Sequence, residues 1–129
     1  MNDSIQFLTI DDILETHSMQ IEKYGGSQGI RDLGLLESAI AQPEASFGSS
    51  YLHSFPFEMA AAYLFHIAMN HPFVDGNKRV GLEAALLFLE VNSISIEASD
   101  DEFVQLVLDT TVGKIDKQGI AEFFRSHSD

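Results

Sequence analysis

The chain has 129 residues, 45% of them apolar, and its 20 acidic and seven basic side chains give a formal net charge of −13. This composition excludes a disordered tail, opposes direct binding of nucleic acid and favours a basic partner segment. The sequence contains no cysteine, which excludes disulfides, zinc–thiolate sites and cysteine nucleophiles.

The first two elements are predicted to be helices. Thr9, with Asp12 three residues later, indicates a helix start, and apolar residues recur at helical spacing until Gly25 ends the helix. A second helix is expected over residues 32–42, because its apolar residues share one face and Pro43 stops it.

A mobile flap is predicted next, at residues 44–55, which are rich in Ser and Gly. Phe47, Tyr51 and Leu52 interrupt this polar stretch. Their side chains could bind an extended substrate peptide along a strand edge or could simply cover the core. The sequence favours neither interpretation over the other.

Two central helices are expected over residues 57–70 and 77–92, where nearly all positions around the helix are apolar. Helices of this kind are buried, so these two should lie at the centre of the domain, joined by a short loop. The sequence therefore predicts an all-α fold, a compact helical bundle with two buried central helices and a short flap or hairpin.

The remaining residues predict a short extended piece and two more helices. Residues 93–97 alternate between polar and apolar types. Ser99 and Glu102 form a capping-box pattern ahead of an apolar series, and Asp116 is expected to cap a last helix that ends at about Arg125.

Length and segment composition predict a single domain over residues 1–129. No stretch of about 18 uncharged apolar residues occurs, which argues against a membrane span. The first residues lack the basic-then-apolar pattern of a secretory signal, so we expect a cytoplasmic protein.

The loop between the central helices carries the densest chemistry of the chain, in residues 71–81. Gly76 and Asn77 can adopt the positive-φ backbone that turns N–H groups toward one point, and a helix begins just after them. Lys78 and Arg79 add two charges to the partial positive charge of the helix N-terminus. This combination predicts a site for an anion such as the phosphate chain of a nucleotide.

Two more side chains of the loop extend this prediction to catalysis. Asp75 would repel phosphate if left alone, which suggests a bridging Mg²⁺, and His71 can accept a proton near neutral pH. Phe73 is expected to anchor the loop in the core, while Pro72 is expected to hold His71 in an extended backbone and end the preceding helix. Each residue alone would fit an ordinary turn and helix cap, but together they favour a functional site.

Residues 71–79 resemble the signature of the Fic/Doc superfamily, His-Pro-Phe-x-(Asp/Glu)-Gly-Asn-(Gly/Lys)-Arg. The resemblance extends to residues 23–34 and 85–89, is strongest to the short Doc (death-on-curing) toxins, and covers nearly the full chain. It implies a Fic-like helical bundle that uses ATP, or another nucleotide triphosphate, with Mg²⁺. It also implies the site residues, which are His71 as catalytic base and, at the nucleotide, Asp75 (also the Mg²⁺ ligand), Gly76 through its backbone, Asn77, Lys78 and Arg79.

Lys78 bears on which phosphate is transferred. A glycine at this position would let the α-phosphate approach the backbone, as adenylyl transfer requires, whereas a lysine fills that space and offers a cation. The nucleotide can then bind reversed and present its γ-phosphate. The resemblance implies a toxin that phosphorylates a protein hydroxyl, by similarity a threonine of elongation factor Tu, and inhibits translation. A Fic-type adenylyltransferase and a non-catalytic interaction module with the same fold are the alternatives.

Regulation is predicted from an incomplete motif. Many Fic proteins carry an inhibitory pattern, (Ser/Thr)-x-x-x-Glu-(Gly/Asn), and the nearest match, residues 18–22, is followed by Lys23 instead. The resemblance then implies a separate antitoxin, whose disordered tail folds into a groove of this protein. Met69 stands where some Doc-type chains carry a cation near the nucleotide, so the affinity or preference for the nucleotide could differ.

Two further features receive structural interpretations. His66 lies five residues before His71, on a different helical face, so a buried and hydrogen-bonded histidine is expected rather than a zinc pair. The glycine-rich residues 23–32 are expected to connect two helices and not to form a second phosphate site, because no Lys-Ser or Lys-Thr pair follows the glycines.

Overall fold

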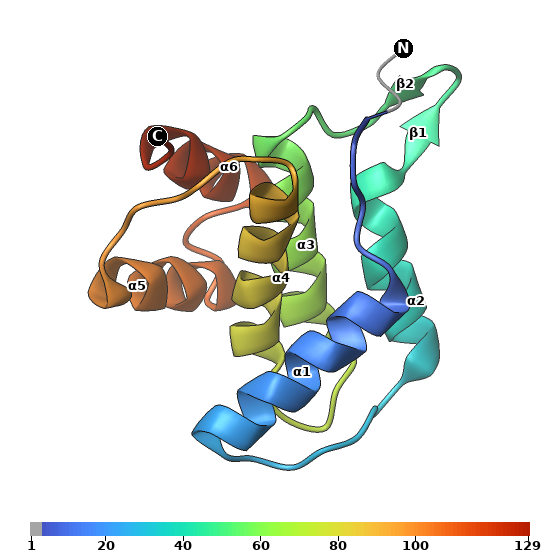
Figure 1. The fold of residues 1–129 in the computed structure, drawn as a ribbon, viewed down its shortest axis with the longest axis vertical. Helices are drawn as coiled ribbons and strands as arrows, with labels where there is room; N and C mark the ends of the chain where they lie inside the picture. The colour runs from blue at the N-terminus through green and yellow to red at the C-terminus, as the bar shows by residue number, and fades with distance from the viewer. Residues whose placement is uncertain (1–3) are drawn as a thin grey trace.

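The computed structural model describes residues 4–129, and this part of the chain is mostly helical, with one small hairpin (Figure 1). In chain order, the elements are α1 (Ile10–Tyr24), α2 (Leu33–Ala41), a 3₁₀ turn (Gln42–Glu44), β1 (Ser46–Phe47), β2 (Ser50–Tyr51), α3 (Phe57–Asn70), α4 (Asn77–Val91), α5 (Asp100–Thr111) and α6 (Lys117–Ser126). The predicted all-α fold with a short hairpin is confirmed. Each helix within residues 4–129 is too short or too polar to cross a membrane.

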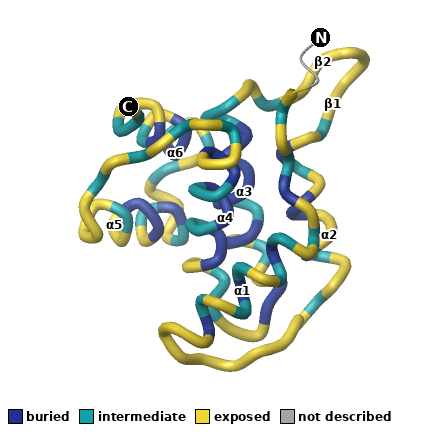
Figure 2. Tube along the Cα trace, in the orientation of Figure 1, coloured by how far each residue is buried: buried dark blue, intermediate teal, exposed yellow. Residues whose placement is uncertain are grey.

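The centre of the molecule is formed by α3 and α4, as their apolar sequences predict. Both helices are buried along much of their length (Figure 2), and they pack on each other more extensively than any other two elements described. Gly81 of α4 permits this approach, because a Cβ atom there would lie 3.0 Å from the carbonyl oxygen of Leu64 in α3. The loop that joins these helices is therefore anchored in the core at both ends.

Side-chain caps determine where several helices begin. Thr9 and Asp12 form a reciprocal capping box at the start of α1, and Ser99 with Glu102 forms another at the start of α5. The Asp116 side chain accepts a backbone hydrogen bond and caps α6. Such caps satisfy N–H groups that have no partner within the helix, and each contributes about 1 kcal/mol. All three starts agree with the sequence prediction.

The predicted flap contains the hairpin of β1 and β2. The strands pair antiparallel, with Ser46 opposite Tyr51 and Phe47 opposite Ser50. Tyr51 contributes to the cover of the core, since its ring centroid lies 5.7 Å from that of Phe7, which packs on the core. Phe47 is 82% exposed and covers no part of the core. The interpretation that the segment covers the core is therefore confirmed for Tyr51 and not for Phe47, and binding of a substrate peptide stays a prediction.

Two predicted elements differ in detail from the structure. The helix expected over residues 32–42 is present as α2, one residue shorter at each end, and it continues into a 3₁₀ turn because the fixed φ of Pro43 suits that turn while its missing N–H interrupts an α-helix. The extended piece expected over residues 93–97 makes only an isolated bridge, between Ile96 and Ser128.

Candidate active site

The motif loop lies between the ends of α3 and α4, beside the glycine-rich connection from α1 to α2 (Figure 1). The N–H groups of Arg31 and Asp32 donate to the Pro72 carbonyl at 2.7 and 3.0 Å. The Val74 N–H donates to the Gly29 carbonyl at 3.0 Å. The glycine-rich residues are thus a structural connection, as predicted, and their backbone also holds the motif loop.

Phe73 anchors the loop in the core, as predicted. Its side chain is 1% exposed, and its ring stacks on the imidazole of His17 in α1, with centroids 3.9 Å apart and 7° between the planes. Nε2 of the buried His17 lies 2.9 Å from the Asp75 carbonyl oxygen, so it donates a hydrogen bond to the loop backbone. Helical periodicity places His17 only on the buried face of α1, and nothing in the sequence indicates these partners.

The Asn77 side chain is a clamp within the loop. Its Oδ1 accepts from the Phe73 N–H at 2.9 Å, and its Nδ2 donates to the Phe73 carbonyl at 3.0 Å. Asn77 is the first residue of α4, and its backbone does not adopt the positive φ expected for it; among the loop glycines, Gly76 does, with φ 79°. The amide therefore shapes the loop, whereas its contact with a nucleotide stays a prediction.

The His71 backbone differs from the prediction. It is left-handed, with φ 50° and ψ 54°, and not extended. Pro72 excludes the right-handed helical region for the preceding residue, but a left-handed residue ends a helix equally well and is a common C-cap. In this conformation the His71 carbonyl accepts a hydrogen bond from Nε of Arg31 at 2.6 Å.

The Asp75 carboxylate is held by two backbone donors. Its Oδ1 accepts from the Gly76 N–H at 3.0 Å, and its Oδ2 accepts from the Ser27 N–H at 3.3 Å. Gly26 leaves room for it, because a Cβ atom at that position would lie 2.9 Å from Oδ2. The connection between α1 and α2 thus fixes the acid as well as the loop backbone.

A cleft of about 770 Å³ brings together all the predicted site residues. They are His71, Asp75, Gly76, Asn77, Lys78 and Arg79. An apolar wall from α4 and α5 continues the cleft, formed by Leu82, Leu86, Phe103, Val104, Val107 and Leu108. The cleft therefore has a polar, cationic end at the motif and an apolar end between two helices, which suits a ligand with an anionic part and an apolar part.

One cation of the cleft, Arg79, has an aromatic neighbour in Tyr24, the last residue of α1, as does Lys23 beside the cleft. The Arg79 guanidinium lies 4.5 Å from the centroid of the Tyr24 ring, and Nζ of Lys23 lies 5.2 Å from it. Such stacking restricts a guanidinium without neutralising it. Glu83 also lines the cleft, and burial raises the pKa of its carboxyl, an effect that Lys23 opposes. Neither residue has a site role in the sequence prediction: Tyr24 lies in the family-like residues 23–34, which are interpreted as a structural connection, and Glu83 belongs to no motif.

His66 lies outside the cleft. Its Nε2 is 3.1 Å from Nζ of Lys117, and the same ammonium lies 3.2 Å from Nε2 of His53. Burial, reinforced by Lys117, lowers the pKa of His66 to about 4, so the imidazole is neutral and accepts from the ammonium. The expected hydrogen bond is confirmed, although the side chain is only half-buried.

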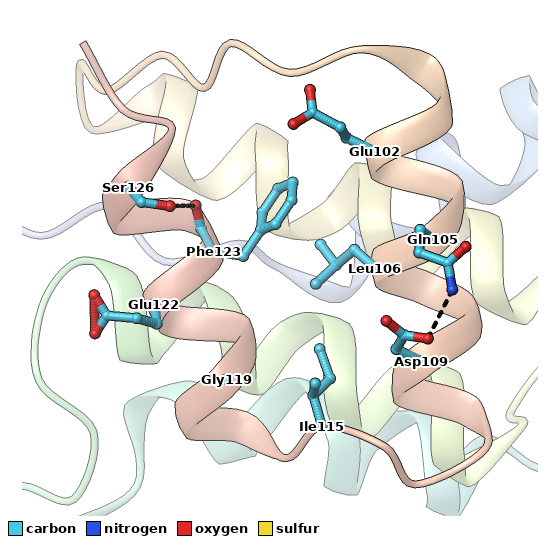
Figure 3. Close-up of a pocket in the computed structure, with 9 residues that line it drawn as sticks. All are labelled: Glu102, Gln105, Leu106, Asp109, Ile115, Gly119, Glu122, Phe123 and Ser126. Carbon is cyan, nitrogen blue, oxygen red and sulfur yellow. Dashed lines mark hydrogen bonds between the residues drawn. The ribbon is translucent and has the colours of Figure 1, made fainter.

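A smaller concavity of about 370 Å³ lies between α5 and α6 (Figure 3). Leu106, Ile115 and Phe123 supply its apolar surface, and Glu102, Asp109 and Glu122 are its acidic residues. None of the predicted site residues lines it. Three carboxylates oppose a phosphate ligand, so the cleft at the motif is the candidate active site.

Comparisons with known proteins show the family of this chain. The model of the Fic/DOC family matches residues 7–89, which include the motif loop. The chain is 36% identical over 96 residues to Toxin Doc of Mycolicibacterium smegmatis (strain ATCC 700084 / mc(2)155), an alignment that covers 74% of this chain and 72% of that protein. It is 31% identical over 121 residues to Protein kinase doc of Escherichia phage P1, with 94% of each chain covered. The protein belongs to the Fic/DOC family, as its sequence predicts.

Proposed function

We propose that this protein is a Doc-type toxin that transfers the γ-phosphate of ATP, or of another nucleotide triphosphate, to a hydroxyl group of a protein. The observation that carries the proposal is the convergence in one cleft, around the start of α4, of His71, Asp75, Lys78 and Arg79. The names of the two relatives, a toxin and a protein kinase, support both parts of it.

The nucleotide phosphates bind at the cationic end of the cleft. Backbone N–H groups at the start of α4 and the side chains of Lys78 and Arg79 attract them. The stacking of Arg79 on Tyr24 orders the guanidinium before the ligand arrives, which reduces the cost of binding. Lys78 fills the space that a glycine would leave beside the backbone, which favours a reversed nucleotide with its γ-phosphate at the reaction centre.

Asp75 fits a Mg²⁺ ion. Each carboxylate oxygen accepts one backbone hydrogen bond and keeps a further lone pair. Mg²⁺ commonly combines one or two carboxylates with phosphate oxygens and water, so a single acid beside a phosphate site is a suitable donor set. When bound, the ion would neutralise charge on the phosphates.

His71 acts as the base in the proposed reaction. The hydroxyl oxygen of the substrate attacks the γ-phosphorus while the bond to the β–γ bridging oxygen breaks. A nucleoside diphosphate leaves, and the hydroxyl proton passes to a ring nitrogen of His71. Lys78 and Arg79 offset the charge on the phosphate oxygens in the transition state.

The target and the partner are proposed from the resemblance. The target is a threonine of elongation factor Tu, whose phosphorylation would inhibit translation. The partner is an antitoxin with a disordered tail that folds on binding. The net charge of −13 favours basic residues in the part of the partner that contacts this protein.

The test uses ATP labelled at either the α- or the γ-phosphate, incubated with the protein and either cell extract or purified elongation factor Tu. We expect protein-bound label from γ-labelled ATP only, and none with His71→Ala. Label from the α position only would replace the proposal with adenylyl transfer. Equal growth arrest by wild type and His71→Ala would indicate a non-catalytic interaction module.

A further inference from the structure

Arg31 makes two side-chain contacts with the end of α3 that the proposed reaction does not use. It lies in the connection between α1 and α2, and its side chain reaches the last carbonyls of α3. Nε donates to the His71 carbonyl at 2.6 Å, and Nη2 donates to the Asn70 carbonyl at 2.9 Å. With its own N–H on the Pro72 carbonyl at 2.7 Å, Arg31 bonds to three consecutive residues.

These contacts fall where the backbone of the catalytic histidine needs support. His71 is left-handed, with φ 50°, a conformation that residues other than glycine rarely adopt. The carbonyls at the end of a helix have no partners within it and carry partial negative charge. A guanidinium is planar and carries several N–H donors, so it can bond to two of these carbonyls at once. The compact ammonium of a lysine does not have this geometry.

We propose that Arg31 is a positioning residue for His71, a role that rests on the phosphotransferase function proposed above. Arg31 does not occur among the described residues that line the cleft, so it acts through the His71 backbone and not on the nucleotide. By holding the two carbonyls, it fixes the His71 backbone and so the direction in which the imidazole projects from it. Proton transfer needs a base within hydrogen-bond reach of the hydroxyl, and small displacements of a catalytic group reduce rates strongly.

The position of Arg31 also makes a rescue experiment possible. Its side chain is exposed to solvent, so a guanidinium ion can reach the place that the Arg31→Ala variant vacates. A lysine can donate to one carbonyl at a time, so Arg31→Lys should retain part of the effect. Arg125→Ala is the matched control, because Arg125 is also exposed and its side chain contacts Glu122, at 2.8 Å, and the Phe57 ring, at 5.5 Å from its centroid, neither of which lines the cleft.

The experiment measures kcat and KM for γ-labelled ATP with wild type, Arg31→Ala, Arg31→Lys and Arg125→Ala, at a temperature where circular dichroism shows all four folded. We expect Arg31→Ala to lower kcat by about 10-fold or more, with KM within about twofold. Arg31→Lys should be intermediate and Arg125→Ala unchanged. Millimolar guanidinium should raise kcat of Arg31→Ala and leave the control as it is.

Two results would overturn the inference: a wild-type kcat in Arg31→Ala, or a loss that guanidinium does not restore at all. If wild type itself transfers no label from ATP, the proposed function fails, and the positioning of His71 is then judged by its NMR Cα shift. A shift in Arg31→Ala that moves away from the left-handed value, and returns with guanidinium, supports the role. An unchanged shift contradicts it.

Discussion

His66 and His71 lie five residues apart, one within α3 and one at its end, and their surroundings differ in kind. His66 is half-buried against α6, where Nζ of Lys117 donates to it at 3.1 Å. His71 is exposed and lines a cleft that also holds Lys78 and Arg79. In the first region an ammonium is bound by imidazole nitrogens, and in the second the cations are left for an outside anion.

The difference shows how a catalytic end and a structural region are built on one helix. Around His66 the side chains bond to one another: the Lys117 ammonium donates to Nε2 of both His66 and His53, while Nδ1 of His53 is buried without a partner. Around His71 the restraint comes from backbone and side-chain bonds to the loop itself, by Arg31, His17 and Asn77. The loop is therefore held while the imidazole of His71 stays open to the cleft.

The largest expected effect is the loss of phosphate-transfer rate on replacing His71, compared with the replacement of His66. His71→Ala should lower the rate of γ-phosphate transfer by about 10²–10⁴-fold, because the proton acceptor is removed. His66→Gln should keep the wild-type rate, since a glutamine oxygen can still accept from Lys117. Initial rates with γ-labelled ATP measure both. Equal losses of rate in the two variants would contradict the assignment of a catalytic role to His71 and a structural role to His66.

The support of the loop can be broken at a glycine. In Gly26→Ala, with φ 116°, the new Cβ would lie 2.9 Å from Oδ2 of Asp75 and must displace the carboxylate. Gly25→Ala is the control, because its φ of 89° causes similar strain while its Cβ would meet no atom within 4 Å. We expect both variants to lower Tm, and Gly26→Ala alone to raise the Mg²⁺ concentration for half-maximal rate, by about 10-fold. The same Mg²⁺ requirement in both would exclude this role of Gly26.

Local sequence rules accounted for the helices and for the motif residues that line the cleft. The capping pairs at Thr9 and Ser99 act within three residues, and the motif is contiguous, so both could be read directly. The left-handed backbone of His71 could not be predicted in this way. The rule for a residue before proline disfavours the right-handed helical region and leaves both the extended and the left-handed regions open.

The supports of the loop were missed for a different reason. His17 and Arg31 contact the loop across 58 and 40 positions of the chain, and no pattern within either segment indicates such partners. Asn77 was assigned to the nucleotide because it belongs to the motif, while in the structure its amide bonds to the backbone of Phe73, four residues earlier. Long-range hydrogen bonds therefore separate the residues that hold a site from those that face it.

Acidification should weaken the region of His66. Burial first, and then Lys117, lowers the pKa of both His53 and His66, that of His66 from 6.5 to about 4. Between these values the unfolded chain binds protons that the folded protein does not, so the free energy of unfolding falls as pH decreases from 6.5 toward 4. We expect a loss on the order of 1 kcal/mol from His66, because solvent screens a half-buried group.

Denaturant unfolding at pH 6.5 and at pH 4.5 measures this loss, with His66→Gln as the comparison. The variant lacks the group that titrates, so its stability should decrease less over the same interval. Carboxyl groups with lowered pKa, such as that of Glu58, lose stability in both proteins and cancel in the difference. If the free energy of unfolding decreased by the same amount in wild type and variant between pH 6.5 and pH 4.5, His66 would not contribute to this loss.

The smallest expected effect has the opposite sign and comes from His127, at the far end of α6. A hydrogen bond to the Phe123 carbonyl raises the pKa of His127, and Glu102, 3.1 Å away, raises it further. Its contribution to stability is therefore complete below pH 6.5 and is lost as pH rises through the raised pKa. We expect His127→Gln to lower Tm by on the order of 1 °C at pH 5.5 and to leave it unchanged at pH 9, because the pair is exposed and screened. A Tm difference that is the same at both pH values would mean that the charge of His127 does not stabilise the fold. If the effects of His66→Gln and His127→Gln on stability instead change with pH in opposite directions, the neighbours of each histidine determine its contribution.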